Sequence, residues 1–146
     1  MAGLLFDSSV YITALRQGDP SILQTRRVRR TSAGESSPLW LSAVVLAELL
    51  VGARDKRDRQ PLLDMERQFL TLKRMVVPEQ RDWRLAGQVL AEMGRRYEYE
   101  QVGQVRLFND ALIAMSVARL GFCVITRNAK DFRTIAALRP FQWEET

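Results

Sequence analysis

The chain contains no histidine and a single cysteine, Cys123, among its 146 residues. Without histidine, neither a Ser-His-Asp nor a Cys-His nucleophile system can be built from this chain alone. The nitrogen and sulfur ligands of a zinc site are almost absent too, so a bound metal ion would be a hard cation held by carboxylates. This favours Mg²⁺ or Mn²⁺. One cysteine also excludes an intramolecular disulfide and fits a reducing, cytoplasmic environment.

Long hydrophobic runs are missing as well. No stretch reaches the roughly 18 apolar residues that a membrane-spanning helix needs, and Glu48 interrupts the longest run. The N-terminal sequence has no basic segment, and Asp7 breaks its apolar run, so we expect no secretory signal. With 47% hydrophobic residues, the chain suffices for one core. We expect a single cytoplasmic domain over residues 1–146, with no membrane partner.

Lysine is scarce: the chain has 3 lysines and 19 arginines, with a formal net charge of +5. Because the guanidinium fork matches pairs of phosphate oxygens, this composition favours a polyanionic partner. A genome that prefers arginine codons would explain it equally simply. Four arginines cluster in "RRVRR", where they would contact RNA phosphates or an acidic segment of a partner protein, or else lie in a solvated loop. These candidates are Arg26, Arg27, Arg29 and Arg30.

Short apolar segments alternate with helical patterns along the chain, which predicts an α/β domain with a parallel sheet. The polar segment 19–38 lacks either period, and we expect a flexible loop there. The predicted strands are 3–6, 39–42, 75–77 and 122–126, with an edge strand at 141–143. The predicted helices are 8–18, a helix after Ser42 that carries Glu48, one beginning near Pro61, then 82–98, 109–121 and 127–138.

Acidic side chains stand where these elements meet. Asp7 ends the first predicted strand, Asp110 opens the helix before the last strand, and Glu48 lies in an apolar helix. Since ligands of open α/β sheets bind at the carboxyl ends of the strands, the three acids can converge there. Carboxylates that converge repel one another unless a cation settles between them. One or two Mg²⁺ ions would meet that need and would activate water against a phosphodiester.

Each acid also has a structural explanation. Asp7 suits a turn or a cap, and Asp110 suits the first turn of a helix, where the helix dipole favours an acid. Glu48 alternatively reaches solvent from a half-buried helix. Asp131 suits a helix N-cap. The combination, rather than any single acid, favours a metal site.

The segment after the last apolar strand supplies secondary candidates. Thr126 would orient a ligand or a water molecule, or simply serve the end of the strand. Asn128 and Asp131 are candidates to complete the metal site. Arg127 is a candidate for contact with a phosphate group.

Three segments taken in order, "LLFDSSVYITAL", "LSAVVLAELLVGA" and "FNDALIAMSVARLGFCVITRNAKDF", resemble a PIN domain, in particular the VapC-type toxins of toxin–antitoxin pairs. The resemblance spans nearly the whole chain and implies a three-layer α/β/α sandwich with a small, mostly parallel sheet. By motif, it makes Asp7, Glu48 and Asp110 the catalytic and metal-binding residues. Where many members carry a further acid, this chain has Asn128.

The resemblance also implies a function. Members are similar to Mg²⁺- or Mn²⁺-dependent endoribonucleases that leave 5′-phosphate and 3′-hydroxyl ends. It implies an RNA substrate, a cognate antitoxin protein and a homodimer, with apolar residues of 10–15 and 61–72 contributing to the protein interfaces. The alternative is a catalytically silent nucleic-acid-binding or assembly module, in which the acids persist as fold elements. Asn128 in place of an acid supports that alternative.

Overall fold

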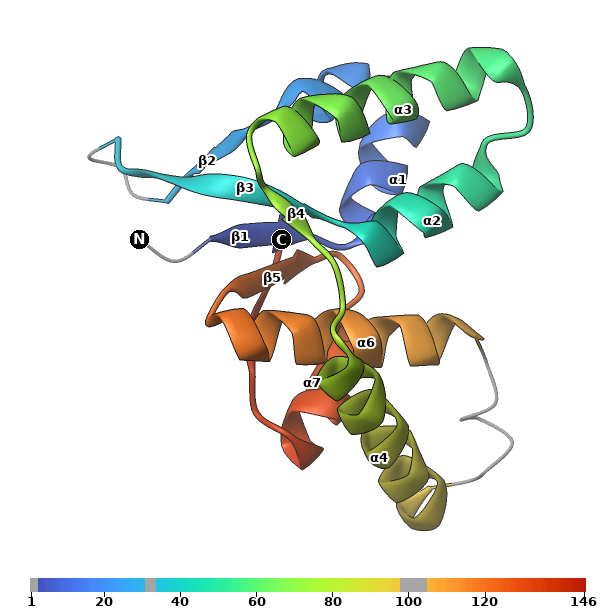
Figure 1. Ribbon diagram of the computed structural model, residues 1–146, viewed down its shortest axis with the longest axis vertical. Coiled ribbons are helices and arrows are strands. Elements are labelled where there is room, and N and C mark those ends of the chain that lie inside the picture. The colour runs from blue at the N-terminus through green and yellow to red at the C-terminus, as the bar shows by residue number, and fades with distance from the viewer. Residues whose placement is uncertain (1–2, 31–33, 98–104) are drawn as a thin grey trace.

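A six-stranded sheet forms the centre of the molecule in a computed structural model, which describes residues 3–30, 34–97 and 105–146 (Figure 1). In chain order the elements are β1 (Leu4–Phe6), α1 (Ser8–Arg16), the 3₁₀ helix η1 (Pro20–Gln24), β2 (Arg27–Arg29), β3 (Ser36–Ser42), α2 (Ala43–Gly52), α3 (Lys56–Thr71), β4 (Met75–Val76), α4 (Gln80–Arg96), α6 (Val105–Leu120), β5 (Cys123–Thr126), α7 (Ala129–Leu138) and β6 (Gln142–Glu145).

The strand order is β2-β3-β1-β5-β6, and β4 pairs with β3. β1 is central and runs parallel to both neighbours, with Leu4 opposite Leu39 on β3 and Cys123 on β5. β4 and β6 also pair in parallel, whereas β2 is antiparallel to β3. The predicted α/β fold with a mostly parallel sheet is confirmed.

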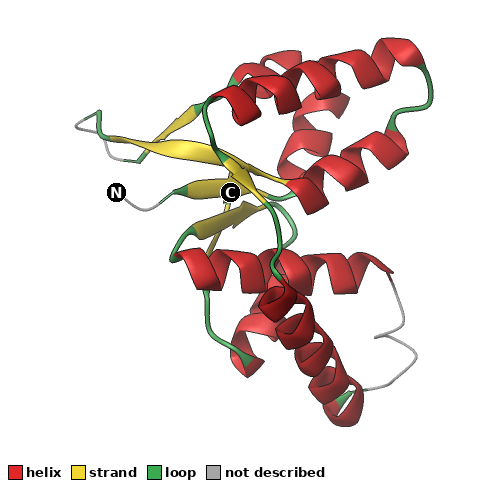
Figure 2. Ribbon diagram, in the orientation of Figure 1, coloured by secondary structure: helices red, strands yellow, loops and turns green. Residues whose placement is uncertain are grey.

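Helices cover both faces of this sheet. α1, α2 and α3 lie on one side of the sheet, and α4, α6 and α7 lie on the other (Figure 2). Between these layers the central strands are buried on both faces, so Leu5, Leu39 and Val124 are fully inaccessible. The predicted three-layer sandwich is therefore confirmed. Within the described part of the chain, no helix has the length and apolar character to cross a membrane.

Helix boundaries follow local capping chemistry. The Ser42 hydroxyl accepts a hydrogen bond from the Val44 amide (3.1 Å) and starts α2, as predicted. The prediction that the next helix begins near Pro61 is wrong, because the Asp55 carboxylate caps α3 by accepting from the Asp58 amide (3.0 Å). Pro61 therefore lies inside α3. The predicted end of α4 at residue 98 falls outside the described residues.

Trp83 departs from the stripe expected on α4. Ala86, Leu90 and Met93 are buried as their helical spacing predicts, but Trp83 is 52% exposed. Its ring packs against Phe108 of α6, with the centroids 5.8 Å apart. The buried face of α4 is thus rotated away from Trp83, which lies at its margin.

The segment 19–38 is more regular than predicted. It contains η1, capped by the Asp19 side chain, then β2 and the first residues of β3. The expectation of irregular structure is wrong for these stretches, because β2 finds backbone partners on β3, with Val28 opposite Ser37. Residues 31–33 lie outside the described residues, and the flexibility of the segment stays a prediction.

Candidate functional site

Asp7 lies where β1 meets α1, at the carboxyl end of the central strand. Its side chain caps α1 by accepting a hydrogen bond from the Ser9 amide (3.0 Å). The Thr126 hydroxyl, at the end of β5, donates to the other carboxylate oxygen (2.8 Å). Burial raises the pKa of Asp7, and the hydrogen bonds from Ser9 and Thr126 oppose that rise. Parallel pairing of β1 and β5 thus creates a buried, hydrogen-bonded carboxylate.

Thr126 and Ser9 join the loop after β5 to the start of α1. The fully buried Thr126 hydroxyl accepts from the Asn128 amide (2.9 Å) while donating to Asp7. The Ser9 hydroxyl accepts from the Arg127 amide (2.9 Å). These contacts hold Asp7 in one orientation.

Glu48 projects from α2 toward the same end of the sheet. Its Oε1 atom is buried and has no hydrogen-bond partner among the described residues. The pKa of Glu48 is raised, chiefly by burial and further by the Asp7 charge, while the neighbouring Asn109, Arg106 and Ser8 side chains oppose the rise. A carboxylate that is neither paired nor free in water is costly to the fold. The apolar helix therefore carries an acid that lacks a partner of its own.

Asp110, in α6, is the most perturbed acid of the group. Its residue is 5% exposed, and its pKa is raised to about 8. Burial is the largest cause, followed by the charges of Asp7, Glu48 and Asp131, with Arg106 acting in the opposite direction. The structure thus brings four acids from separate segments into one electrostatic environment, as Asp7, Glu48, Asp110 and Asp131 were predicted to be.

The two secondary candidates on α7 differ. Asp131 lies in the first turn of α7, and its charge reaches Asp110. Asn128 is the N-cap residue of α7, but its side chain makes no capping hydrogen bond. Asp131 therefore contributes negative charge to the cluster, whereas Asn128 contributes its backbone amide to Thr126.

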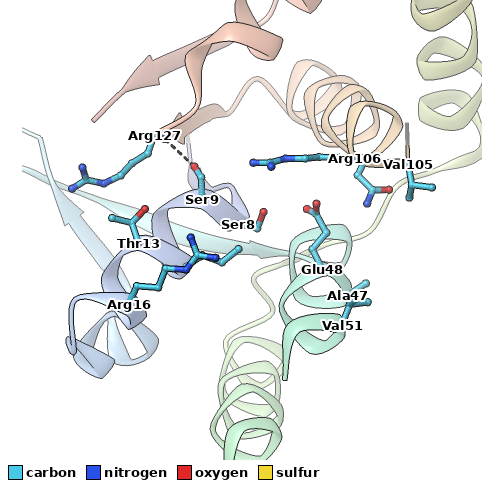
Figure 3. A pocket seen from close by; sticks show the side chains of 12 residues that line it. Ser8, Ser9, Thr13, Arg16, Ala47, Glu48, Val51, Val105, Arg106 and Arg127 are labelled. Carbon is cyan, nitrogen blue, oxygen red and sulfur yellow. Dashed lines mark hydrogen bonds between the residues drawn. The ribbon is translucent and has the colours of Figure 1, made fainter. Parts of the chain in front are cut away.

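A pocket of about 580 Å³ opens beside Glu48, between α1, α2 and the start of α6 (Figure 3). Three arginines from different elements, Arg16, Arg106 and Arg127, line it. The sequence interpretation found only Arg127. Arg106 lies one helical turn before Asp110, and that i, i+4 spacing was the signal that could have identified it. The other lining residues are Ser8, Ser9, Ile12, Thr13, Ala47, Glu48, Val51, Val105 and Asn109.

The "RRVRR" arginines do not line this pocket. Arg26 donates to backbone carbonyls, and its guanidinium lies over an aromatic ring. Arg27 donates to the opposite strand of its hairpin, and Arg30 forms a two-pronged ion pair with Glu144 (2.6 and 2.7 Å). Arg29 is exposed on β2. Their contact with RNA stays a prediction, and three of the four already serve contacts within the fold.

The chemistry of the acidic cluster fits a hard divalent cation, because every candidate donor is a carboxylate, hydroxyl or amide oxygen. The partnerless Glu48 oxygen is the observation that favours such an ion. In the part of the chain that the structure describes, no three acidic side chains are grouped closely enough to hold a metal ion as they stand. Binding a cation therefore requires these carboxylates to turn toward one another.

Solved structures with the same fold are complexes of one kind. The chain is similar to "DNA bound VapBC from Salmonella typhimurium", with a TM-score of 0.62 and 19% identity over 99% of this chain and 98% of that one. VapBC2 from Rickettsia felis, bound to a promoter DNA fragment, gives 0.58 and 19%, covering 99% and 98%. VapBC-1 from nontypeable Haemophilus influenzae gives 0.57 and 19%, covering 98% and 97%. At these identities the likeness establishes the fold.

Family membership rests on the sequence itself. No curated protein matches the chain. The family model described as "PIN domain" matches residues 4–138, from β1 to the end of α7. That range includes every acid of the cluster. The chain belongs to the PIN domain family.

Proposed function

We propose that this protein is a Mg²⁺- or Mn²⁺-dependent endoribonuclease and the toxin of a toxin–antitoxin pair. The single observation that carries the proposal is the buried, partnerless Oε1 of Glu48 beside the highly perturbed Asp110. A fold that keeps such acids together without pairing them gains nothing in stability. Their arrangement is explained by a positively charged ligand.

Asp7 and Asp110 are the principal metal ligands in this proposal, and Glu48 is a ligand or positions the attacking water. When bound, the cation would lower the pKa of a water molecule and stabilise charge on the phosphodiester. Ser9 and Thr126 hold Asp7 ionised and oriented, because their hydrogen bonds favour its charged form.

The arginines of the pocket supply the phosphate contacts. Arg16, Arg106 and Arg127 reach it from α1, α6 and the loop after β5, so phosphates on both sides of the scissile bond find a guanidinium. In hydrolysis, the water oxygen bonds to phosphorus, the bond to the 3′ oxygen breaks, and that oxygen takes a proton. The products carry 5′-phosphate and 3′-hydroxyl ends.

Exposed apolar side chains support a protein partner. Leu15 on α1, Val51 on α2, and Leu63 and Leu70 on α3 are each at least 36% exposed. The neighbours of this fold are VapBC complexes, which supports an antitoxin as one partner. We propose a homodimer in the cytoplasm as the free form.

The direct test is cleavage of a structured RNA pool by the purified chain in Mg²⁺ or Mn²⁺, and then in EDTA. Asp110→Asn, purified in parallel, controls for a contaminating nuclease. Cutting that requires the metal and disappears in the variant supports the proposal. Equal cutting by both proteins would refute it.

A catalytically silent nucleic-acid-binding module is the second candidate. It is favoured by the absence, among the described residues, of three acids already grouped around one point. That function predicts RNA binding without cleavage and no uptake of Mn²⁺ by calorimetry.

A further inference from the structure

We propose that Arg106 is the resident counter-ion of the acidic cluster, and that a divalent cation must compete with its guanidinium to bind. This positioning role deepens the proposed function and rests on it. It assigns to a residue outside the metal ligands the task of keeping the metal-free site folded and of setting its affinity for the cation.

Geometry places Arg106 where such a counter-ion is needed. It lies in the first turn of α6, four residues before Asp110, so both side chains lie on the same side of that helix. Arg106 and Glu48 line the same pocket. Figure 3 shows the Arg106 side chain extending from α6 across the pocket toward α1, passing over Ser8 and Glu48 in this view.

Arg106 is also the cation that two of the acids share. Its charge is among the largest opposing influences on both Glu48 and Asp110, whereas Arg16 is not among the largest influences on either. Arg106 is itself exposed, so water and salt screen its charge, and its effect is moderate.

The same placement explains why the acids remain apart. With a guanidinium already balancing part of their charge, the carboxylates are not forced into a tight group in the metal-free chain, and no group of three is found among the described residues. A divalent ion would supply two charges at shorter range and would release the guanidinium toward the pocket. There it is free to contact a phosphate.

The test uses Mn²⁺ alone, without RNA. Calorimetry at low salt compares the wild type with Arg106→Gln, Arg106→Lys and the pocket control Arg16→Gln. Arg106→Gln is expected to bind Mn²⁺ about threefold to tenfold more tightly than the wild type, because the competing cation is gone. Arg106→Lys and Arg16→Gln should bind like the wild type.

A metal-free measurement gives a second readout. In EDTA at low ionic strength, Arg106→Gln should unfold about 2 °C below the wild type, and about 0.5 M NaCl should remove the difference. Unchanged or weaker Mn²⁺ binding by Arg106→Gln, or equal tightening in Arg16→Gln, overturns the assignment to Arg106. If the wild type itself binds no Mn²⁺, the metal-dependent function fails together with the competition, and that result is distinct from failure of Arg106 alone.

Discussion

The Thr126 hydroxyl donates a hydrogen bond of 2.8 Å to the Asp7 carboxylate, across 119 residues of sequence. The two residues end β1 and β5, which pair in parallel with Phe6 opposite Ile125. Because Thr126 is fully buried and also accepts from the Asn128 amide, its hydroxyl hydrogen is directed at Asp7. The candidate site is therefore oriented by a donor that lies outside the acidic cluster.

Replacing Thr126 tests this orientation. Thr126→Val keeps the shape of the side chain but removes the donor, so the pKa of Asp7 should rise further and Mn²⁺ affinity should fall about tenfold. Thr126→Ser keeps the hydroxyl and should bind nearly as the wild type does. Calorimetry with Mn²⁺ measures both. Equal affinities for Thr126→Val and the wild type would show that the hydrogen bond has no role at the site.

Asp110 makes the stability of the metal-free chain depend on pH. Its folded-state pKa of about 8 lies above the ordinary 3.8, so between these values the folded chain holds a proton that the unfolded chain has released. The free energy of unfolding should therefore decrease as pH rises from about 4 to about 8, by about 1 kcal/mol per pH unit. Urea unfolding in EDTA measures it. Asp110→Asn should flatten the dependence, and an equally steep slope in that variant would contradict this origin.

The same proton opposes metal binding. Because a carboxylate must lose its proton to coordinate a cation, Mn²⁺ affinity should rise up to about tenfold per pH unit between pH 6 and 8, and level off above that. Calorimetry in buffers of different ionisation enthalpy also counts the proton released. Affinity that is independent of pH in this range would mean that Asp110 is not a ligand.

Arg127 should contribute to RNA affinity through charge. Arg127→Gln removes one guanidinium from the pocket, so the slope of log affinity against log salt should fall by about 1 in magnitude. Binding is measured in EDTA to prevent cleavage. Arg67→Gln, on α3 and already paired with Asp64, is the matched control. The same loss of slope in both variants would indicate non-specific contact.

A buried ion pair on the opposite helical layer tests the fold alone. Asp82 of α4 is fully buried and accepts from Arg119 of α6 (3.0 Å). Arg119→Met leaves that carboxylate unpaired and should lower the free energy of unfolding by about 3 kcal/mol. The exposed Arg67–Asp64 pair is the comparison, and Arg67→Met should cost under about 1 kcal/mol. Similar losses from the two variants would refute the difference in burial as the cause.

Local chemistry made much of the fold predictable. Ser42 and the apolar run after it announce α2, and the short apolar strand at β5 could hardly be read otherwise. Segment 19–38 could not be predicted in this way, because β2 owes its conformation to hydrogen bonds with β3, which are not written in its own residues. Pro61 misled for a related reason: Asp55 starts the helix a turn earlier and the helix continues through it.

The sequence by itself determined the kind of chemistry: a chain without histidine, rich in arginine, with acids at the ends of apolar segments, indicates carboxylates acting on a phosphate-bearing partner. Only the tertiary structure decided which side chains meet. It brought Arg16 and Arg106 to the pocket, committed Arg26 and Arg30 to contacts elsewhere, and left Glu48 without a partner. Residue types and local periods are properties of the chain, whereas burial and the distances between charges exist only after parallel strands have paired.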